Sequence, residues 1–221
     1  MKAASIFFSF VWILSASASP AQSAAASSAT DSMLIEAVQK GDSAIVQGLL
    51  SQGVDVNCSD EKGRTALMWA AREGRADVAK LLLSKGANMS ARSEGGWTAL
   101  MAAAHNGQLE TMKVLMEKGA KINDQSLDGT TVLMWAVISG NPDNVKMLLE
   151  KGADINAPDN NGVTPLIGAV FDGKTEIAKA LLEKGADVNV KTKSGQTALM
   201  VARQRGRPEL QELLLKAGAK Q

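Results

Sequence analysis

The alternation of apolar and polar positions repeats along most of this chain with a period of 33 residues. In each period a threonine precedes a short apolar phrase, a glycine follows it, and a second apolar stretch with helical spacing leads to another glycine. Self-similarity at this period predicts a stack of helical units, because each unit can bury its apolar face only against its neighbours. The threonines that mark the period are Thr65, Thr98, Thr131, Thr164 and Thr197.

The unit over residues 60–91 shows which elements one period predicts. Thr65 precedes the first apolar phrase, and its hydroxyl is suited to accept a hydrogen bond from the first helical turn. We expect Gly74 to end this short helix in a left-handed conformation, and Asp77 to begin a second helix that ends at Gly86. Two helices and a polar turn therefore make one layer. The side chains expected to face inward are Leu67, Ala70, Ala71, Val78, Leu81 and Leu82.

The capping, turn and leucine-pair signals together resemble the ankyrin-repeat family over about residues 32–220. Thr164-Pro165-Leu166 is the best match to the T-P-L-H motif of that family. The histidine of the motif, which in the family ties neighbouring turns together by hydrogen bonds, is absent, so we expect van der Waals packing to substitute for it. The residues in its place are Met68, Met101, Met134, Ile167 and Met200.

The resemblance implies an all-α ankyrin-repeat solenoid of six stacked helix–turn–helix repeats with short projecting β-turn or hairpin loops. The repeat domain is expected to cover residues 32–221, with a capping repeat at each end. The predicted repeats run approximately over residues 32–59, 60–92, 93–125, 126–158, 159–191 and 192–221.

The N-terminal segment differs in composition from the repeats. Lys2 is followed by an uncharged run over residues 3–14, which is shorter than the roughly 20 apolar residues that a membrane-spanning helix needs. Small residues follow this run, so we interpret residues 1–21 as a cleaved secretory signal peptide; the alternative is an uncleaved membrane anchor. Residues 22–31 are rich in alanine and serine, and we expect a flexible linker there. This interpretation predicts export to a bacterial periplasm and no membrane association after cleavage.

The charges of the chain nearly balance, with 24 Lys and Arg against 23 Asp and Glu. Nucleic-acid binding needs a net basic surface, so we expect no nucleic-acid partner. Solvated surface charge is favoured over a local polyanion site around Arg64, Arg72 and Arg75. A single cysteine, Cys58, excludes an intramolecular disulfide, and we interpret it as a quietly packed small side chain rather than a reactive thiol. The chain is expected to be a monomer.

The first helix of each repeat presents one face with mixed polar and apolar side chains, because positions three and four apart are neighbours on a helix. The resemblance implies that this face and the projecting turns form a concave surface that holds partners. Clustered exposed aromatic residues on it indicate a binding hot spot; the alternative is that Trp69 and Trp135 fill gaps left by Ala102 and Gly168. The predicted partner-binding residues are Trp69, Arg72, Trp97, His105, Leu127, Trp135, Ile138, Val163 and Phe171.

Residues suited to catalysis or metal binding are scarce. His105 is the single histidine and has neither a nucleophile nor a carboxylate beside it, so we predict no catalytic residue and no enzyme activity. One histidine and one cysteine cannot supply the ligands of a zinc site, and the methionine row is expected to fill the core rather than to bind a soft metal. Turn formation explains Asp128, Asp159 and Asp172 better than cation binding does. We expect no metal and no cofactor.

These patterns lead to one principal hypothesis and two alternatives. The principal hypothesis is a non-catalytic scaffold or adaptor in the cell envelope that binds another protein through the concave face of the repeats. The alternatives are a structural or stress-protective envelope protein without a single dedicated partner, and a secreted effector directed at a host. Because a fold does not imply a function, only the residues on the exposed face can identify the partner.

Overall fold

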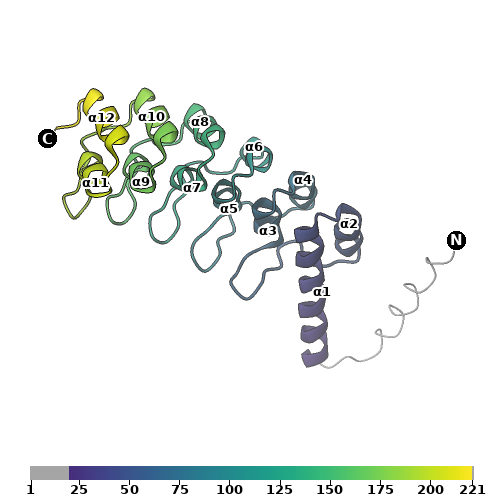
Figure 1. Cartoon of the computed structure of the whole chain (residues 1–221). Coiled ribbons are helices and arrows are strands. Elements are labelled where there is room, and N and C mark those ends of the chain that lie inside the picture. The colour runs from purple at the N-terminus through teal and green to yellow at the C-terminus, as the bar shows by residue number, and fades with distance from the viewer. Residues whose placement is uncertain (1–19, 221) are drawn as a thin grey trace.

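The computed structural model describes the backbone of residues 20–220 and the side chains of residues 29–220. Most of the predicted signal peptide, residues 1–19, therefore lies outside the described residues. Within the described range, twelve helices follow one another as pairs of a first and a second helix. Figure 1 shows the two layers that these helices form, with the connecting loops projecting beyond the layer of first helices. The predicted all-α repeat solenoid is confirmed.

We refer to the first helices of the pairs as the inner layer and to the second helices as the outer layer. The inner layer consists of α1 (Pro20–Lys40), α3 (Ala66–Arg72), α5 (Ala99–His105), α7 (Val132–Ser139), α9 (Pro165–Asp172) and α11 (Ala198–Gln204). The outer layer consists of α2 (Ser43–Ser51), α4 (Ala76–Ser84), α6 (Leu109–Glu117), α8 (Pro142–Glu150), α10 (Thr175–Glu183) and α12 (Pro208–Lys216).

The five marker threonines are the N-caps of the inner helices α3 to α11, as predicted. Each hydroxyl oxygen accepts a hydrogen bond from the amide three residues later, at distances between 3.2 and 3.4 Å. All five threonine residues are buried, so the capping bond also satisfies a polar group inside the stack. The inner helices α3 to α11 therefore begin at equivalent positions of their repeats, which places their equivalent residues in columns.

Hydrogen bonds tie the neighbouring turns together, so the expectation that van der Waals packing alone replaces the missing histidine is wrong. The backbone of each hairpin turn donates to the preceding one: Glu94 N to Lys62 O at 3.1 Å, and Asn160 N to Asp128 O at 3.0 Å. A second row uses asparagine side chains, such as Asn123 Oδ1, which accepts from the backbone amide 31 residues later at 2.9 Å. The other members of this row are Asn57, Asn156 and Asn189.

Side chains at the start of the outer helices also tie each repeat to the one before it. The Lys174 ammonium donates to the backbone oxygens of Val137 and Ile138 at 2.7 and 2.5 Å. Arg75 donates to the backbone oxygen of Gln39 at 3.1 Å in the same way. Positive charge at the carbonyl end of a helix is favourable, because the last carbonyl groups there have no partner within the helix.

The methionine row fills the core between the inner helices, as predicted. Met68, Met101 and Met134 are buried, and Ile167 takes the same place in the next repeat. Met200 is the exception: it lies on α11, the last inner helix of the described residues, and 48% of its surface is exposed. Cys58 is also buried, and loss of solvent around its thiol raises its pKa to about 12, so the sulfur is an unreactive packed group.

Helix α1 extends over the segment for which a flexible linker was predicted, so that prediction is wrong. The helix begins at Pro20 and continues through residues 22–31 into the first repeat. The segment is rich in alanine, which has the highest helix propensity of the amino acids, and proline is well suited to the first helical position. In the described part of the chain no helix, α1 included, is sufficiently long and apolar to cross a bilayer.

Two buried polar side chains interrupt the apolar packing of the outer layer. Thr111 on α6 and Asn144 on α8 stand 33 residues apart, at the position that Val78 and Ile177 occupy in other repeats. Both are fully or almost fully buried, and no protein group among the described residues accepts from or donates to their side chains. A buried polar group without a partner costs about 1–3 kcal/mol.

Replacing Thr111 and Asn144 together by valine, the residue at the equivalent position 78, is therefore expected to raise the free energy of unfolding by about 1–3 kcal/mol. Urea unfolding followed by circular dichroism measures the change. The matched control is Lys146→Val, which adds the same side chain at an exposed position of α8 and should leave the midpoint nearly unchanged. A lower midpoint in the double variant would contradict the interpretation of the buried pair.

Candidate functional site

The inner helices present two columns of side chains on the face from which the loops project. One column contains the last or next-to-last residue of the inner helices α3 to α9, and its members 33 residues apart are Arg72, His105, Ile138 and Phe171. The other column lies one helical turn earlier and contains Trp69, Ala102, Trp135 and Gly168. We call this surface, together with the hairpin turns beside it, the inner-helix face. The structure thus brings the predicted partner-binding residues onto one surface.

The exposure of these residues is uneven. Leu127, Ile138 and Phe171 are exposed apolar side chains, with 71%, 43% and 48% of their surface accessible. Arg72 is exposed as well. The residues Trp69, Trp97, His105, Trp135 and Val163 are only partly exposed. The predicted residues therefore fall into two groups, of which one is exposed and the other is partly buried.

Trp97, His105 and Trp135 form one aromatic cluster that joins two repeats. The rings of Trp97 and Trp135 are tilted against each other with centroids 4.2 Å apart. The imidazole of His105 meets both indoles edge-on, at 5.4 and 5.2 Å. Both tryptophans also pack on the buried core, so they contribute to stability in addition to shaping the surface. Trp135 does not fill the gap at Gly168, however, because a Cβ atom there would meet no neighbouring atom of the described residues within 4 Å.

Trp69 is held by charged side chains from its own repeat. Its indole nitrogen donates to Asp60 Oδ2 at 3.1 Å, and Arg64 Nε donates to the same oxygen at 2.7 Å. The guanidinium groups of Arg64 and Arg72 lie over the Trp69 ring, 4.2 and 4.9 Å from its centroid. Cation–π contacts of this kind fix the ring and keep the guanidinium groups at the surface.

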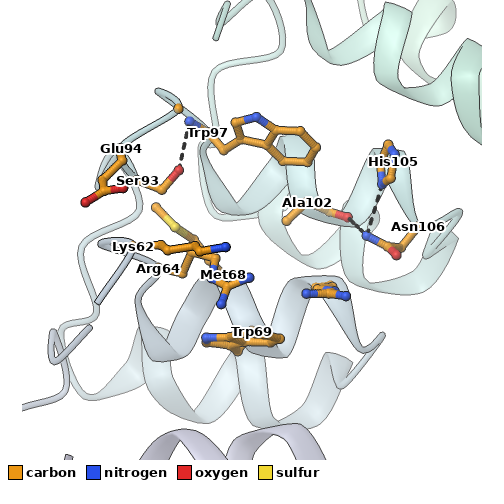
Figure 2. A pocket seen from close by; sticks show the side chains of 12 residues that line it. Lys62, Arg64, Met68, Trp69, Ser93, Glu94, Trp97, Ala102, His105 and Asn106 are labelled. Atoms are coloured by element: carbon orange, nitrogen blue, oxygen red, sulfur yellow. Dashed lines mark hydrogen bonds between the residues drawn. The ribbon is translucent and has the colours of Figure 1, made fainter. Parts of the chain in front are cut away.

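A pocket of about 380 Å³ opens between α3 and α5, and we call it the α3–α5 pocket. Figure 2 shows the rings of Trp69 and Trp97 on opposite sides of it, with Ala102 between them. Ala102 occupies the column position at which the neighbouring repeats carry Trp69 and Trp135. The pocket exists because this small side chain leaves the space that a third indole would fill.

Positive charge predominates at the rim of the α3–α5 pocket. Lys62, Arg64 and Arg72 line it, and Glu94 is the one acidic residue among the lining side chains. Burial lowers the pKa of His105, which lines the pocket, and the nearby charge of Arg72 lowers it further, so the neutral imidazole is favoured. The pocket therefore combines apolar walls with guanidinium and ammonium donors.

Asp60 keeps its charge beside this cluster. Burial raises the pKa of Asp60, but hydrogen bonds from Arg64 and from the Lys62 amide outweigh this effect, so the pKa is lowered overall. Its Oδ1 accepts from the backbone amides of Lys62 and Arg64, which shapes the hairpin turn, and its Oδ2 orients Arg64 and Trp69. The Asp60 carboxylate thus accepts hydrogen bonds both from the backbone of the hairpin turn and from two side chains of the pocket wall.

The other end of the inner-helix face carries a second aromatic–arginine contact. The guanidinium of Arg205 lies 3.6 Å from the centroid of the exposed Phe171 ring. Val163 lies in a hairpin turn whose form is set by Asp159, because Asp159 Oδ1 accepts from the Val163 amide at 2.8 Å. Asp128 Oδ1 likewise accepts from Thr130 N at 3.2 Å, so the predicted turn role is confirmed for Asp128 and Asp159. Asp172 is instead the last residue of α9, and its carboxylate lies 3.3 Å from the Lys174 ammonium.

Several residues of the pocket were missed by sequence reasoning. Lys62 and Glu94 line it but carry no motif that singles them out, and the sequence indicates Ala102 only as a gap for a tryptophan, not as part of a pocket. The alternation of tryptophan with alanine and glycine in one column was available as a signal, because a small residue between two large ones leaves a gap. Within residues 20–220 no group of three or more His, Cys, Asp or Glu side chains is placed to hold a metal ion.

Comparison with known families agrees with this architecture. The family model described as ankyrin repeats (3 copies) matches the chain over residues 9–93, 34–126, 92–159 and 133–221. No curated protein matches the chain significantly. The match covers the inner-helix face and the hairpin turns, as well as the helices that support them.

The variant Asp60→Asn tests the role of this carboxylate through pH. A carboxyl group whose pKa is lowered in the folded state stabilises the fold above its unfolded value, 3.8, and loses this contribution as pH falls through the folded value. We expect Asp60→Asn to lower the free energy of unfolding by about 1 kcal/mol at pH 7, because Arg64 loses its charged partner. At pH 3 the difference from wild type should be smaller.

Urea unfolding at the two pH values, followed by tryptophan fluorescence, measures both quantities. Asp77→Asn is the matched control, since the Asp77 side chain is 89% exposed and contacts only Lys80 at 3.5 Å. A difference between wild type and Asp60→Asn that stays constant from pH 7 to pH 3 would contradict the role of the charge.

Proposed function

Because this chain belongs to the ankyrin-repeat family, whose repeats are generally protein–protein interaction modules, we propose that it is a non-catalytic scaffold that binds another protein. The binding surface in this proposal is the inner-helix face of the repeats that contain α3 to α10. Ankyrin-repeat proteins are typically non-enzymatic scaffolds, and the residues of this face offer anchoring groups rather than reacting ones.

The observation that carries the proposal is the exposure of large apolar side chains in a row on one face. Ile138 and Phe171 occupy equivalent positions on α7 and α9, and Leu127 projects from the hairpin turn before α7. An exposed apolar row beside packed indoles and surface guanidinium groups has the composition of interface hot spots, in which aromatic residues and arginine are enriched. Each anchor would lose contact with water when a partner covers the face.

The cell envelope is the proposed location. The short uncharged run after Lys2, followed by small residues, supports export by a cleaved signal peptide. Export beyond the envelope towards a host would use the same signal, and fractionation of the producing cell distinguishes the two destinations. A structural role without a dedicated partner is the remaining alternative, and it would leave the exposed apolar row without a ligand.

The double variant Ile138→Ala with Phe171→Ala tests the proposed surface. We expect it to weaken the affinity for the principal partner captured from envelope extract by tenfold or more, on the order of the loss at an interface hot spot. These two side chains are preferable to Trp97 and Trp135, whose truncation would also disturb the packing between repeats. The measurement is capture of a stoichiometric partner by immobilised protein, followed by titration of that partner.

The matched control is Ile45→Ala with Leu215→Ala, which removes two apolar side chains of similar exposure, 51% and 41%, from the outer helices α2 and α12. Binding should change by less than about twofold in the control, because single exposed apolar residues on other faces carry no partner. Equal losses in both double variants, or the absence of a stoichiometric partner, would favour the purely structural alternative.

A further inference from the structure

The side chains that line the α3–α5 pocket favour some protein partners over others. Its walls are the rings of Trp69 and Trp97 and the small side chain of Ala102, which together suit an apolar side chain. Its rim carries Lys62 and Arg72, and neither has a buried acidic partner among the described residues. Arg72 has only an exposed contact to Glu73 at 3.5 Å, and such surface ion pairs contribute little.

The charges at the rim are not part of a uniformly basic molecule. The chain as a whole has 24 basic and 23 acidic residues, so the excess of positive charge at this pocket is local. Stacking over Trp69 keeps the guanidinium groups of Arg64 and Arg72 beside an apolar wall, where water screens them less. A planar guanidinium group in this setting is suited to bind a carboxylate through two parallel hydrogen bonds.

We propose that the α3–α5 pocket binds an acidic segment of the partner protein, in which an apolar side chain enters the pocket and neighbouring carboxylates pair with Lys62 and Arg72. This inference rests on the proposed function, because it assigns the chemistry of the segment that contacts one part of the inner-helix face. A volume of about 380 Å³ lies within the range of ligand pockets and accommodates one apolar side chain with room for a carboxylate beside it.

The surroundings of the pocket determine the direction in which the segment continues. On the N-terminal side a hollow of about 660 Å³ is lined by two basic residues, Lys62 and Arg64, and by four acidic ones, Asp31, Glu36, Asp60 and Glu61. The excess of acidic side chains there would repel a second run of carboxylates. On the C-terminal side the face continues over Trp135 and Ile138 towards Phe171 and Arg205. The acidic segment therefore runs from the pocket towards α9, where Arg205 offers a further cationic group.

The test uses a synthetic peptide of sequence Gly-Ser-Asp-Leu-Glu-Asp-Ser-Gly, with blocked ends, titrated into the full chain. The indole N–H signals of the ¹⁵N-labelled protein report binding, and those of Trp69 and Trp97 should shift first. We expect a Kd at or below about 1 mM for this short probe. The same peptide with serine in place of leucine, or with lysine in place of each acidic residue, should bind at least tenfold more weakly.

Two protein variants separate the contributions of charge and space. Lys62→Glu with Arg72→Glu is expected to weaken binding of the peptide at least tenfold, because it places carboxylates where carboxylates must bind. The matched control is Lys146→Glu with Lys179→Glu, which changes the net charge equally at exposed positions of α8 and α10. Ala102→Val narrows the pocket without changing any charge and should also weaken binding.

The outcomes that overturn the inference are distinct from those that overturn the proposed function. Unchanged peptide affinity in the Lys62/Arg72 double variant, or no binding of the acidic peptide at all, would reject the acidic segment. N-acetyl-leucine binding as tightly as the peptide would instead make the pocket a site for small carboxylic acids. In either case a captured partner that still depends on Ile138 and Phe171 would leave the proposed function intact.

Discussion

The structure depends on the burial of each inner helix between its two neighbours. Alanines such as Ala70 and Ala103 are fully buried at these contacts, and the methionines at the position after each leucine fill the space that remains. Because the five repeats after the first begin with a threonine cap, their inner helices stand in register and their equivalent side chains form columns. The inner-helix face is a consequence of this register. Along a column that continues through five repeats, the exposed side chain can differ from repeat to repeat while the packing of the helices behind it stays the same.

The function proposed for the inner-helix face follows from the side chains that occupy its two columns. In one, tryptophan alternates with alanine and glycine, so the small residue leaves a pocket where it stands between two indoles. In the other, the side chain changes from Arg72 through His105 to Ile138 and Phe171, so the face becomes more apolar towards the C-terminal repeats. In the proposed function, a partner would meet positive charge at α3, an apolar row at α7 and α9, and the guanidinium of Arg205 beside Phe171. The two ends of the face therefore differ in chemistry from its middle.

The sequence was sufficient to predict the repeat, the caps and the surface on which the aromatic residues lie, because each follows from a spacing within one unit. It was insufficient for contacts that depend on distances between units. The half-burial of Trp97 and Trp135 arises because turn and helix of adjacent repeats bring the rings within 4.2 Å. The pocket over Ala102 and the shared carboxylate of Asp60 are of the same kind. The helix over residues 22–31 was missed for another reason: alanine was interpreted as linker composition, although its helix propensity favours α1.

The joint between the third and fourth repeats is built differently on its two sides. On the inner side Trp97 and His105 meet Trp135 in a ring cluster, although the buried indole nitrogen of Trp135 has no hydrogen-bond partner in the described part of the chain. On the outer side the column passes through Thr111 and Asn144, whose polar atoms also lack protein partners among the described residues. The aromatic contacts between these two repeats therefore lie on the surface that a ligand would cover. A change in the orientation of the Trp135 ring would affect both repeats, because Trp97 and His105 contact this ring from the repeat before it.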